Sequence, residues 1–158
     1  MRRVAAIAAL ALFAVAPGGE ASGQPISAAE LHDWANQMNQ FRYGPTGCPL
    51  LVDKVQRILR SFRLGEDTRW EWTDEDFGRG VAGYTHYEFH PVTGETRNHR
   101  TEISTPEANR SSHRSFLWGI AHEALHWVNN VGVENGRETE RHLGPDWQRL
   151  DDCFTDAW

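Results

Sequence analysis

The chain of 158 residues has only two cysteines, no run of basic residues and no apolar run of membrane-spanning length. Its cysteines, Cys48 and Cys153, form no CxxC pair, which argues against a cysteine zinc site or a redox motif. The arginines are scattered among acids and the formal net charge is −6, so we expect no nucleic-acid partner. The longest apolar run, residues 4–16, is shorter than the roughly 20 residues of a membrane-spanning helix, and no permanent membrane span is expected.

The N-terminal segment has the layout of a secretory signal peptide. Arginines precede its apolar run, and Ala21 and Gly23 are the small residues that fit cleavage after Gly23. A retained N-terminal anchor is the alternative to cleavage. We therefore expect an exported protein, periplasmic or secreted, in which residues 1–23 are the signal and residues 24–158 form a single domain.

Export changes the interpretation of the two cysteines, because disulfides form and persist outside the cytoplasm. We expect Cys48 and Cys153 to be bonded to each other, with two separate buried thiols as the alternative. The bridge would tie the end of the chain to an early segment and contribute about 4 to 5 kcal/mol in the chain-entropy model.

Hydrophobic periodicity predicts helices near both ends of the chain. Ser27 and Glu30 form a capping box at the start of the first helix. Its apolar positions continue at helical spacing to Phe41, and we interpret them as core rather than ligand contacts. A second helix is expected over residues 49–64, and a short last helix over about residues 146–154.

From Trp70 the hydrophobic period changes to two, which predicts strands. The three expected strands are residues 69–73, 80–91 and 95–104, with a hairpin turn at residues 91–94. In the middle strand one face carries Thr85, Tyr87 and Phe89, and the other carries Tyr84, His86 and Glu88. We interpret His86, His90 and His99 as polar positions of a half-exposed sheet and not as a metal cluster. With the helices, these strands predict an α+β fold with a small, mostly antiparallel sheet.

A further helix carries the motif "IAHEALHW", residues 120–127. Its start is either Thr105, capping a helix with Pro106 at the first position, or Ser111 or Ser112 after a loop. The apolar residues that flank the motif continue the helical spacing, so the motif is expected in the interior of the helix.

The motif has the spacing of a catalytic zinc site. His122 and His126 project from the same side of a helix about one turn apart, so both imidazoles can bind one zinc ion. Glu123 lies beside that side, where a carboxylate can take a proton from a water that the zinc holds. We expect one Zn²⁺ per chain, with Glu123 as catalytic base. A surface histidine pair beside a solvated acid is the alternative.

A catalytic zinc site needs a third protein ligand and one open position. The downstream candidates are Glu138, Glu140, His142 and Asp146. His142 is preferred because imidazole is a good zinc donor and the Gly-Pro turn that follows would hold its backbone. Glu138 or Glu140 is the alternative ligand.

The stretch "HEALHW" followed by "RHLGPDWQRL" resembles the SprT-like zinc metalloprotease family, as does the strand "GVAGY" before the motif helix. The resemblance covers the chain from the predicted strands to the last helix. It implies a compact zincin-like domain with one zinc ion held by His122, His126 and His142, and with Glu123 as catalytic base. Leu143 departs from the family pattern, in which the third histidine and the glycine are adjacent.

Together these features predict an exported zinc metalloprotease that hydrolyses peptide bonds and takes a protein or peptide as substrate. A non-catalytic zinc-binding or protein-binding module is one alternative, and a hydrolase of a non-peptide amide such as a cell-wall bond is another. Residues 98–104 are expected to form the sheet edge that pairs with extended substrate. The candidates for stabilising the oxyanion are Tyr84, His86, His113 and Arg141.

Overall fold

The computed structural model describes residues 3–5, 23–43, 48–62, 69–127, 132–134, 137–139 and 145–155. Its helices are α1 (Ala28–Gln37), α2 (Cys48–Ser61), α3 (Thr105–Arg110), α4 (His113–His126) and α5 (Pro145–Thr155), with the 3-10 helix η1 (Met38–Tyr43) after α1. Its strands are β1 (Arg3–Ala5), β2 (Gln24–Pro25), β3 (Arg69–Thr73), β4 (Gly83–Phe89), β5 (Thr96–Ser104), β6 (Gly132–Glu134) and β7 (Arg137–Thr139). The predicted α+β class is confirmed.

Five of the strands form one mixed sheet in the order β1-β4-β5-β3-β2. Only the pairing of β3 with β5 is parallel, so the sheet is mostly antiparallel as predicted. β6 and β7 form a separate two-stranded ladder. The expectation that residues 98–104 form a free sheet edge is wrong. They belong to β5, which bonds to β4 on one side and to β3 on the other, so its backbone groups are already used within the sheet.

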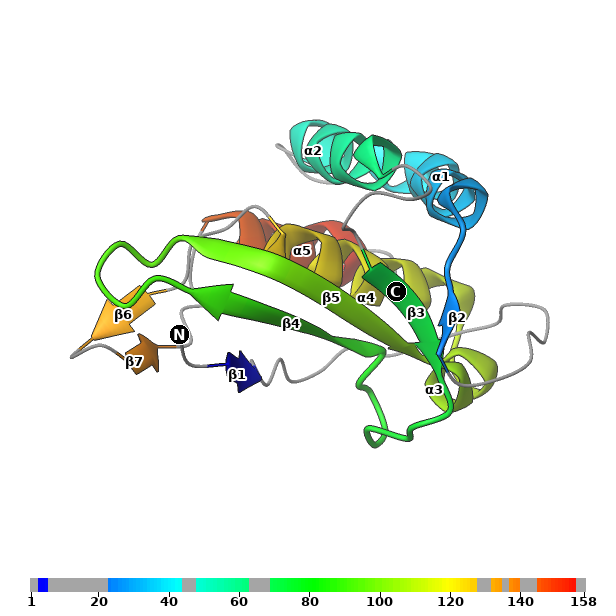
Figure 1. Ribbon diagram of the computed structural model, residues 1–158. Helices are drawn as coiled ribbons and strands as arrows, with labels where there is room; N and C mark the ends of the chain where they lie inside the picture. Colours follow the sequence, from blue (N-terminus) through cyan, green and yellow to red (C-terminus); the bar gives the residue numbers. More distant parts are fainter. Residues whose placement is uncertain are drawn as a thin grey trace.

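The α4 helix lies between the sheet and the α1–α2 pair (Figure 1), and α5 packs beside it. Its residues from Ile120 to His126 are all buried, because this part of α4 is covered on every side. Gly119 permits the close approach of α4 to the chain just before β4. A Cβ at that position would lie 2.5 Å from the Cβ of Ala82. Aromatic residues fill the space above the sheet, with Trp34 packed on both Trp70 and Phe116.

The starts of the helices follow local capping chemistry. The capping box of Ser27 and Glu30 is confirmed at the start of α1. Thr105 is not the cap of α3. Ser104 has that role, because its extended backbone lets its hydroxyl accept from the amide of Glu107 at 3.2 Å. A break then separates α3 from α4, whose N-cap is Ser112. This confirms the predicted alternative in which the motif helix begins at Ser111 or Ser112.

Part of the predicted signal peptide has a described backbone. Residues Arg3–Ala5 form β1, which pairs antiparallel with β4. Residues 6–22 lie outside the described part of the chain, so the signal and the domain boundary after it stay predictions. Among the described residues, no helix combines the length and the apolarity that crossing a membrane requires.

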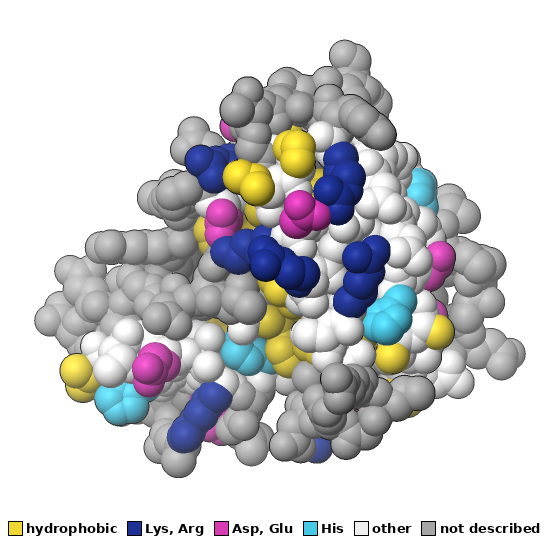
Figure 2. All heavy atoms as spheres, turned by 90° about the horizontal axis from the view of Figure 1, so that it is seen from above, with side chains coloured by type: hydrophobic (Ala, Val, Ile, Leu, Met, Phe, Trp, Pro, Cys, Tyr) yellow, Lys and Arg dark blue, Asp and Glu magenta, His cyan; other side chains and the backbone are white. Residues whose placement is uncertain are grey.

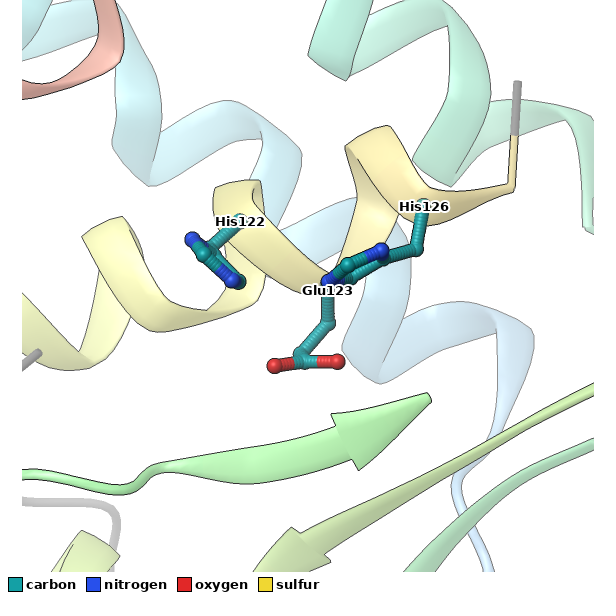
Figure 3. A group of neighbouring side chains, drawn as sticks. All are labelled: His122, Glu123 and His126. Atoms are coloured by element: carbon teal, nitrogen blue, oxygen red, sulfur yellow. The ribbon is translucent and has the colours of Figure 1, made fainter. Parts of the chain in front are cut away.

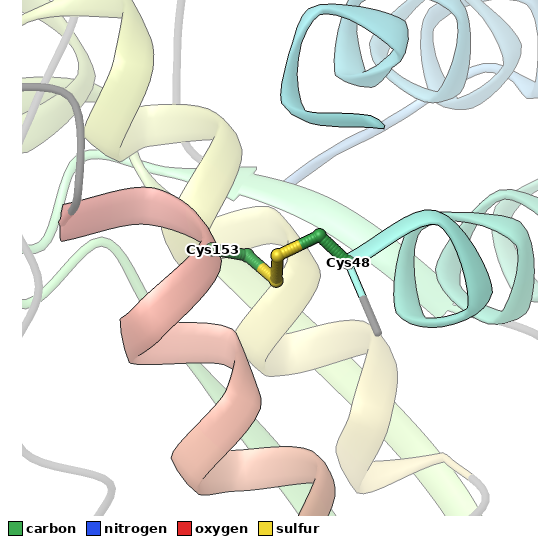
Figure 4. The surroundings of a disulfide bond; sticks show 2 residues. All are labelled: Cys48 and Cys153. Carbon is green, nitrogen blue, oxygen red and sulfur yellow. A yellow bond between two sulfur atoms is a disulfide. The ribbon is translucent and has the colours of Figure 1, made fainter. Parts of the chain in front are cut away.

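The predicted disulfide between Cys48 and Cys153 is present, with a Cα–Cα distance of 5.5 Å. Figure 4 shows that it joins the beginning of α2 to α5. Both cysteines are buried, and no cysteine is free. The bridge therefore holds the last described helix against the N-terminal helices across 105 positions of sequence.

We expect the double replacement Cys48→Ser with Cys153→Ser to lower the free energy of unfolding by about 4 kcal/mol, because the unfolded chain regains the entropy that the closed loop removes. Urea denaturation of the two proteins measures the difference. Wild type kept in a thiol reductant should match the double variant, since it loses the same covalent bond. Equal stability of all three would show that the bridge contributes nothing to folding.

Candidate metal centre

His122, Glu123 and His126 form one buried cluster on α4, and their potential ligand atoms all lie within 4.8 Å of one another. Figure 3 shows the two imidazoles on neighbouring turns, with the Glu123 side chain extending from α4 toward the sheet. The exposed fraction is 7% for each histidine and 3% for the glutamate. The motif is therefore an interior feature of the fold, and the alternative of a surface histidine pair with a solvated acid is wrong.

Aromatic side chains surround the two imidazoles. The ring of Trp147, from α5, lies 4.5 Å from the His122 ring and 4.9 Å from the His126 ring, measured between centroids. Trp118 stacks on His122 at 5.0 Å. Tyr87 of β4 approaches His126 at 6.2 Å. These rings restrict the rotation of both imidazoles and lower the local polarity, which strengthens electrostatic interactions within the cluster.

A chain of hydrogen bonds reaches Glu123 from the sheet. The hydroxyl of Thr85 lies 2.6 Å from the carboxylate oxygen Oε2 of Glu123. The same hydroxyl lies 2.9 Å from that of Thr101 on β5. The indole Nε1 of Trp127 lies 2.9 Å from the Thr101 hydroxyl. Both threonines are buried, so the chain crosses the interface between α4 and the sheet away from water.

The donors and acceptors of this chain can be ordered in one direction when Glu123 is ionised. An indole N–H can only donate, so Thr101 accepts from Trp127. A carboxylate can only accept, so the single hydroxyl proton of Thr85 goes to Glu123. Thr101 must then donate to Thr85. In this order Oε2 accepts the hydrogen bond from Thr85, and Oε1 is left as the oxygen through which Glu123 can exchange a proton.

The environment changes the acidity of Glu123. Burial raises its pKa from the ordinary value of 4.5 to about 7, and the hydrogen bond from Thr85 acts in the opposite direction. In the metal-free protein the carboxyl group therefore titrates close to neutral pH, which is the range in which a proton acceptor works best as a general base at physiological pH.

The raised pKa of Glu123 predicts how the stability of the metal-free Glu123→Gln variant, compared with the wild type, changes with pH. Between pH 4.5 and about 7 the native state holds more protons on Glu123 than the unfolded chain, so the wild type loses stability as pH rises. Glutamine cannot ionise and avoids this loss. Relative to the wild type, we expect the free energy of unfolding of the variant to increase by up to roughly 3 kcal/mol between pH 5 and pH 8. Urea denaturation in a chelator at both pH values measures the gain, and a difference that did not change with pH would contradict the argument.

The third ligand is not settled by the described residues. His142 and Glu140 lie outside them, and Glu138 lies in β7, where only the backbone is described. Asp146 is in the first turn of α5 and forms an ion pair with Lys54 of α2, which engages its carboxylate outside the cluster. His142 therefore stays the predicted third ligand, with Glu138 and Glu140 as alternatives.

The proposed oxyanion-stabilising residues do not come together at the cluster. Tyr84 and His86 project from the face of β4 opposite to Thr85, and His86 lies 3.2 Å from Glu102 on β5. His113 begins α4, and the nine residues before His122 correspond to roughly 13 Å along the helix axis. These three assignments are wrong, because strand alternation and helix length place the side chains elsewhere. Arg141 lies outside the described residues.

The sequence interpretation missed the residues that hold Glu123. Thr85 was placed correctly on the face shared with Tyr87, and both are buried. The available signal was the small polar side chain of Thr85 beside aromatic residues on one strand face, because a buried hydroxyl needs a hydrogen-bond partner. Thr101 gave no comparable signal, since its partner depends on the register between β4 and β5.

Comparison of the chain with protein-family models, with curated protein sequences and with solved structures finds no match. The interpretation of the cluster therefore depends on its own chemistry. Two neutral imidazoles suit several transition metals, zinc among them, and the adjacent carboxylate is held by a protein hydroxyl on one oxygen. The described residues thus fit a transition-metal site beside a carboxylate that a protein hydroxyl holds in place.

Proposed function

We propose that this protein is an exported zinc metalloprotease with a zincin-like fold, similar to the SprT-like family. His122 and His126 would hold the metal with a third ligand from the segment after α4, for which His142 is the preferred residue. The observation that carries the proposal is the buried cluster of both histidines with Glu123. A glutamate with no chemical role would gain nothing from this position, where burial disfavours its charge.

Zinc, when bound, supplies a Lewis acid that lowers the pKa of a coordinated water toward about 7. Glu123 takes a proton from the attacking water through Oε1 and returns it to the leaving amine. Thr85 holds the other oxygen at 2.6 Å, so the carboxylate keeps one orientation during both transfers. The aromatic rings around the imidazoles keep bulk water away from the cluster.

The proposal is tested by measuring metal content and hydrolysis on the same purified protein. Elemental analysis after dialysis against metal-free buffer should give about one zinc per chain. The protein should cleave an unfolded polypeptide such as casein, and a chelator should stop the cleavage until zinc is restored. Zinc without cleavage would favour the non-catalytic binding module, or a hydrolase of another amide. Absence of zinc after reconstitution would remove the metal site altogether.

Thr85→Val should lower kcat for peptide cleavage about tenfold and leave the zinc content unchanged, because the variant keeps the shape of the side chain but no longer orients Glu123. Thr85→Ser is the matched control, since it keeps the hydroxyl. Steady-state kinetics on a fluorogenic peptide measures both. Equal activity of the valine variant and the wild type would show that the hydrogen bond does not position the base.

A further inference from the structure

A groove lies among η1, α2 and α5, apart from the metal centre, and has a volume of about 490 Å³. It is lined by Arg42, Leu50, Leu51, Asp53, Lys54, Gln56, Arg57, Arg60, Asp146 and Arg149. We call it the α2 groove. Figure 2 shows Lys and Arg side chains gathered on the face seen from above, with acidic and hydrophobic side chains among them. The function proposed above makes no use of this groove.

The α2 groove carries an excess of positive charge in a chain whose formal net charge is −6. Its two acids are each engaged within the groove: Asp53 pairs with Arg42, and Asp146 pairs with Lys54. Within the described part of the chain, Arg57, Arg60 and Arg149 form no ion pair. Three guanidinium groups therefore line the groove with no carboxylate of the described residues in ion-pair contact.

The positive side chains follow one side of α2. Leu50, Lys54, Arg57 and Arg60 are separated by three or four positions, which places them on the same helix face. The distance from Leu50 to Arg60 is about 15 Å at the rise of an α-helix. Leu50 is 70% exposed and lies at the beginning of this row. The groove thus offers an apolar contact at one end and guanidinium groups toward the other.

We propose that the α2 groove binds an acidic peptide segment of about five extended residues, carried by a partner or substrate protein. Carboxylates of the segment would bind Arg57 and Arg60, whose planar guanidinium groups can each hold a carboxylate through two hydrogen bonds. An apolar side chain of the segment would cover Leu50. A single phosphate would reach only part of the row, and the acids Asp53 and Asp146 oppose a continuous polyphosphate backbone. The proposal requires neither bound metal nor hydrolysis.

Fluorescence anisotropy with the metal-free full-length protein tests this binding. The probe is a labelled peptide of consecutive glutamates that ends in leucine, and the matched peptide has glutamine at each glutamate. We expect saturable binding of the acidic peptide only. Arg57→Glu and Arg60→Glu should each raise its Kd about tenfold or more, because each removes a charge-assisted contact and adds repulsion. Arg79→Glu is the control, since it makes the same charge change at an exposed residue outside the groove.

The single lysine of the chain, Lys54, lines the groove and therefore gives a second measurement of where the peptide binds. Bound acidic peptide should protect Lys54 from an amine-reactive reagent, as measured by mass spectrometry of the digest. The proposal would be overturned if Arg79→Glu weakened binding of the acidic peptide as much as Arg57→Glu does, or if the glutamine peptide bound as tightly as the acidic one. Tighter, Arg57-dependent binding of duplex DNA or of anionic lipid vesicles would also overturn it, by assigning the groove to another class of partner.

Discussion

Glu123→Gln is expected to lower peptide hydrolysis by roughly a hundred- to ten-thousandfold while the zinc stays bound. The ligand nitrogens of His122 and His126 are untouched by the change, so metal affinity should be retained. The glutamine carbonyl can still accept the hydrogen bond that Thr85 donates to Glu123, which preserves the local structure. What is lost is a group that accepts a proton from water, and single-turnover cleavage of a fluorogenic peptide measures that loss.

The control for Glu123→Gln is the zinc content of the same sample, because a metal-free variant would be inactive for another reason. Glu107→Gln is less suitable as a matched acid, since Glu107 is buried in a structural network with Gly80 and Ser111. Glu75→Gln changes an exposed acid of the segment between β3 and β4 and should keep full activity. Hydrolysis by Glu123→Gln at the wild-type rate, with zinc bound, would falsify the assigned role of Glu123.

His122→Ala and His126→Ala are expected to abolish stoichiometric zinc binding, and with it hydrolysis. Each change removes one imidazole from a site with only three predicted protein ligands, so the loss of affinity should exceed the roughly 10- to 100-fold typical of changes around a metal site. Competition with a chromophoric chelator measures the affinity. His142→Ala, measured in the same assay beside Glu138→Ala and Glu140→Ala, identifies the third ligand.

His113→Ala is the control for these variants, because His113 is exposed at the start of the same helix and should leave zinc binding unchanged. Circular dichroism separates loss of metal from loss of fold. This check is needed because α4 is buried along most of its length. A folded His122→Ala variant that still bound one zinc ion tightly would show that the metal is held elsewhere.

Local sequence determined much of this protein. The capping box at Ser27, the period-two alternation of β4 and the helix around the motif all depend on residues a few positions apart, and each formed where expected. The placement of His122 beside His126 also needs only one helix turn. The disulfide was predictable for a different reason: a chain with only two cysteines has one intramolecular pairing available.

Tertiary structure decided which neighbours these elements acquired. Periodicity shows which face of a strand is buried, but it does not show the order of strands in a sheet, so β5 was mistaken for an edge. The N-cap of α3 is Ser104 and not the predicted Thr105, because the end of β5 sets the backbone conformation there. The convergence of Arg42, Arg57 and Arg149 on one groove likewise requires three elements to pack together.

The metal centre shows the same division. The sequence alone determined that two imidazoles and a carboxylate share one stretch of α4, because the helix repeat relates them directly. Only the packing of α4 against the sheet decided that Thr85 would hold Glu123, and only the β4–β5 register brought Thr101 beside Thr85. Contacts between residues distant in sequence depend on how whole elements pack, and no local pattern records that arrangement.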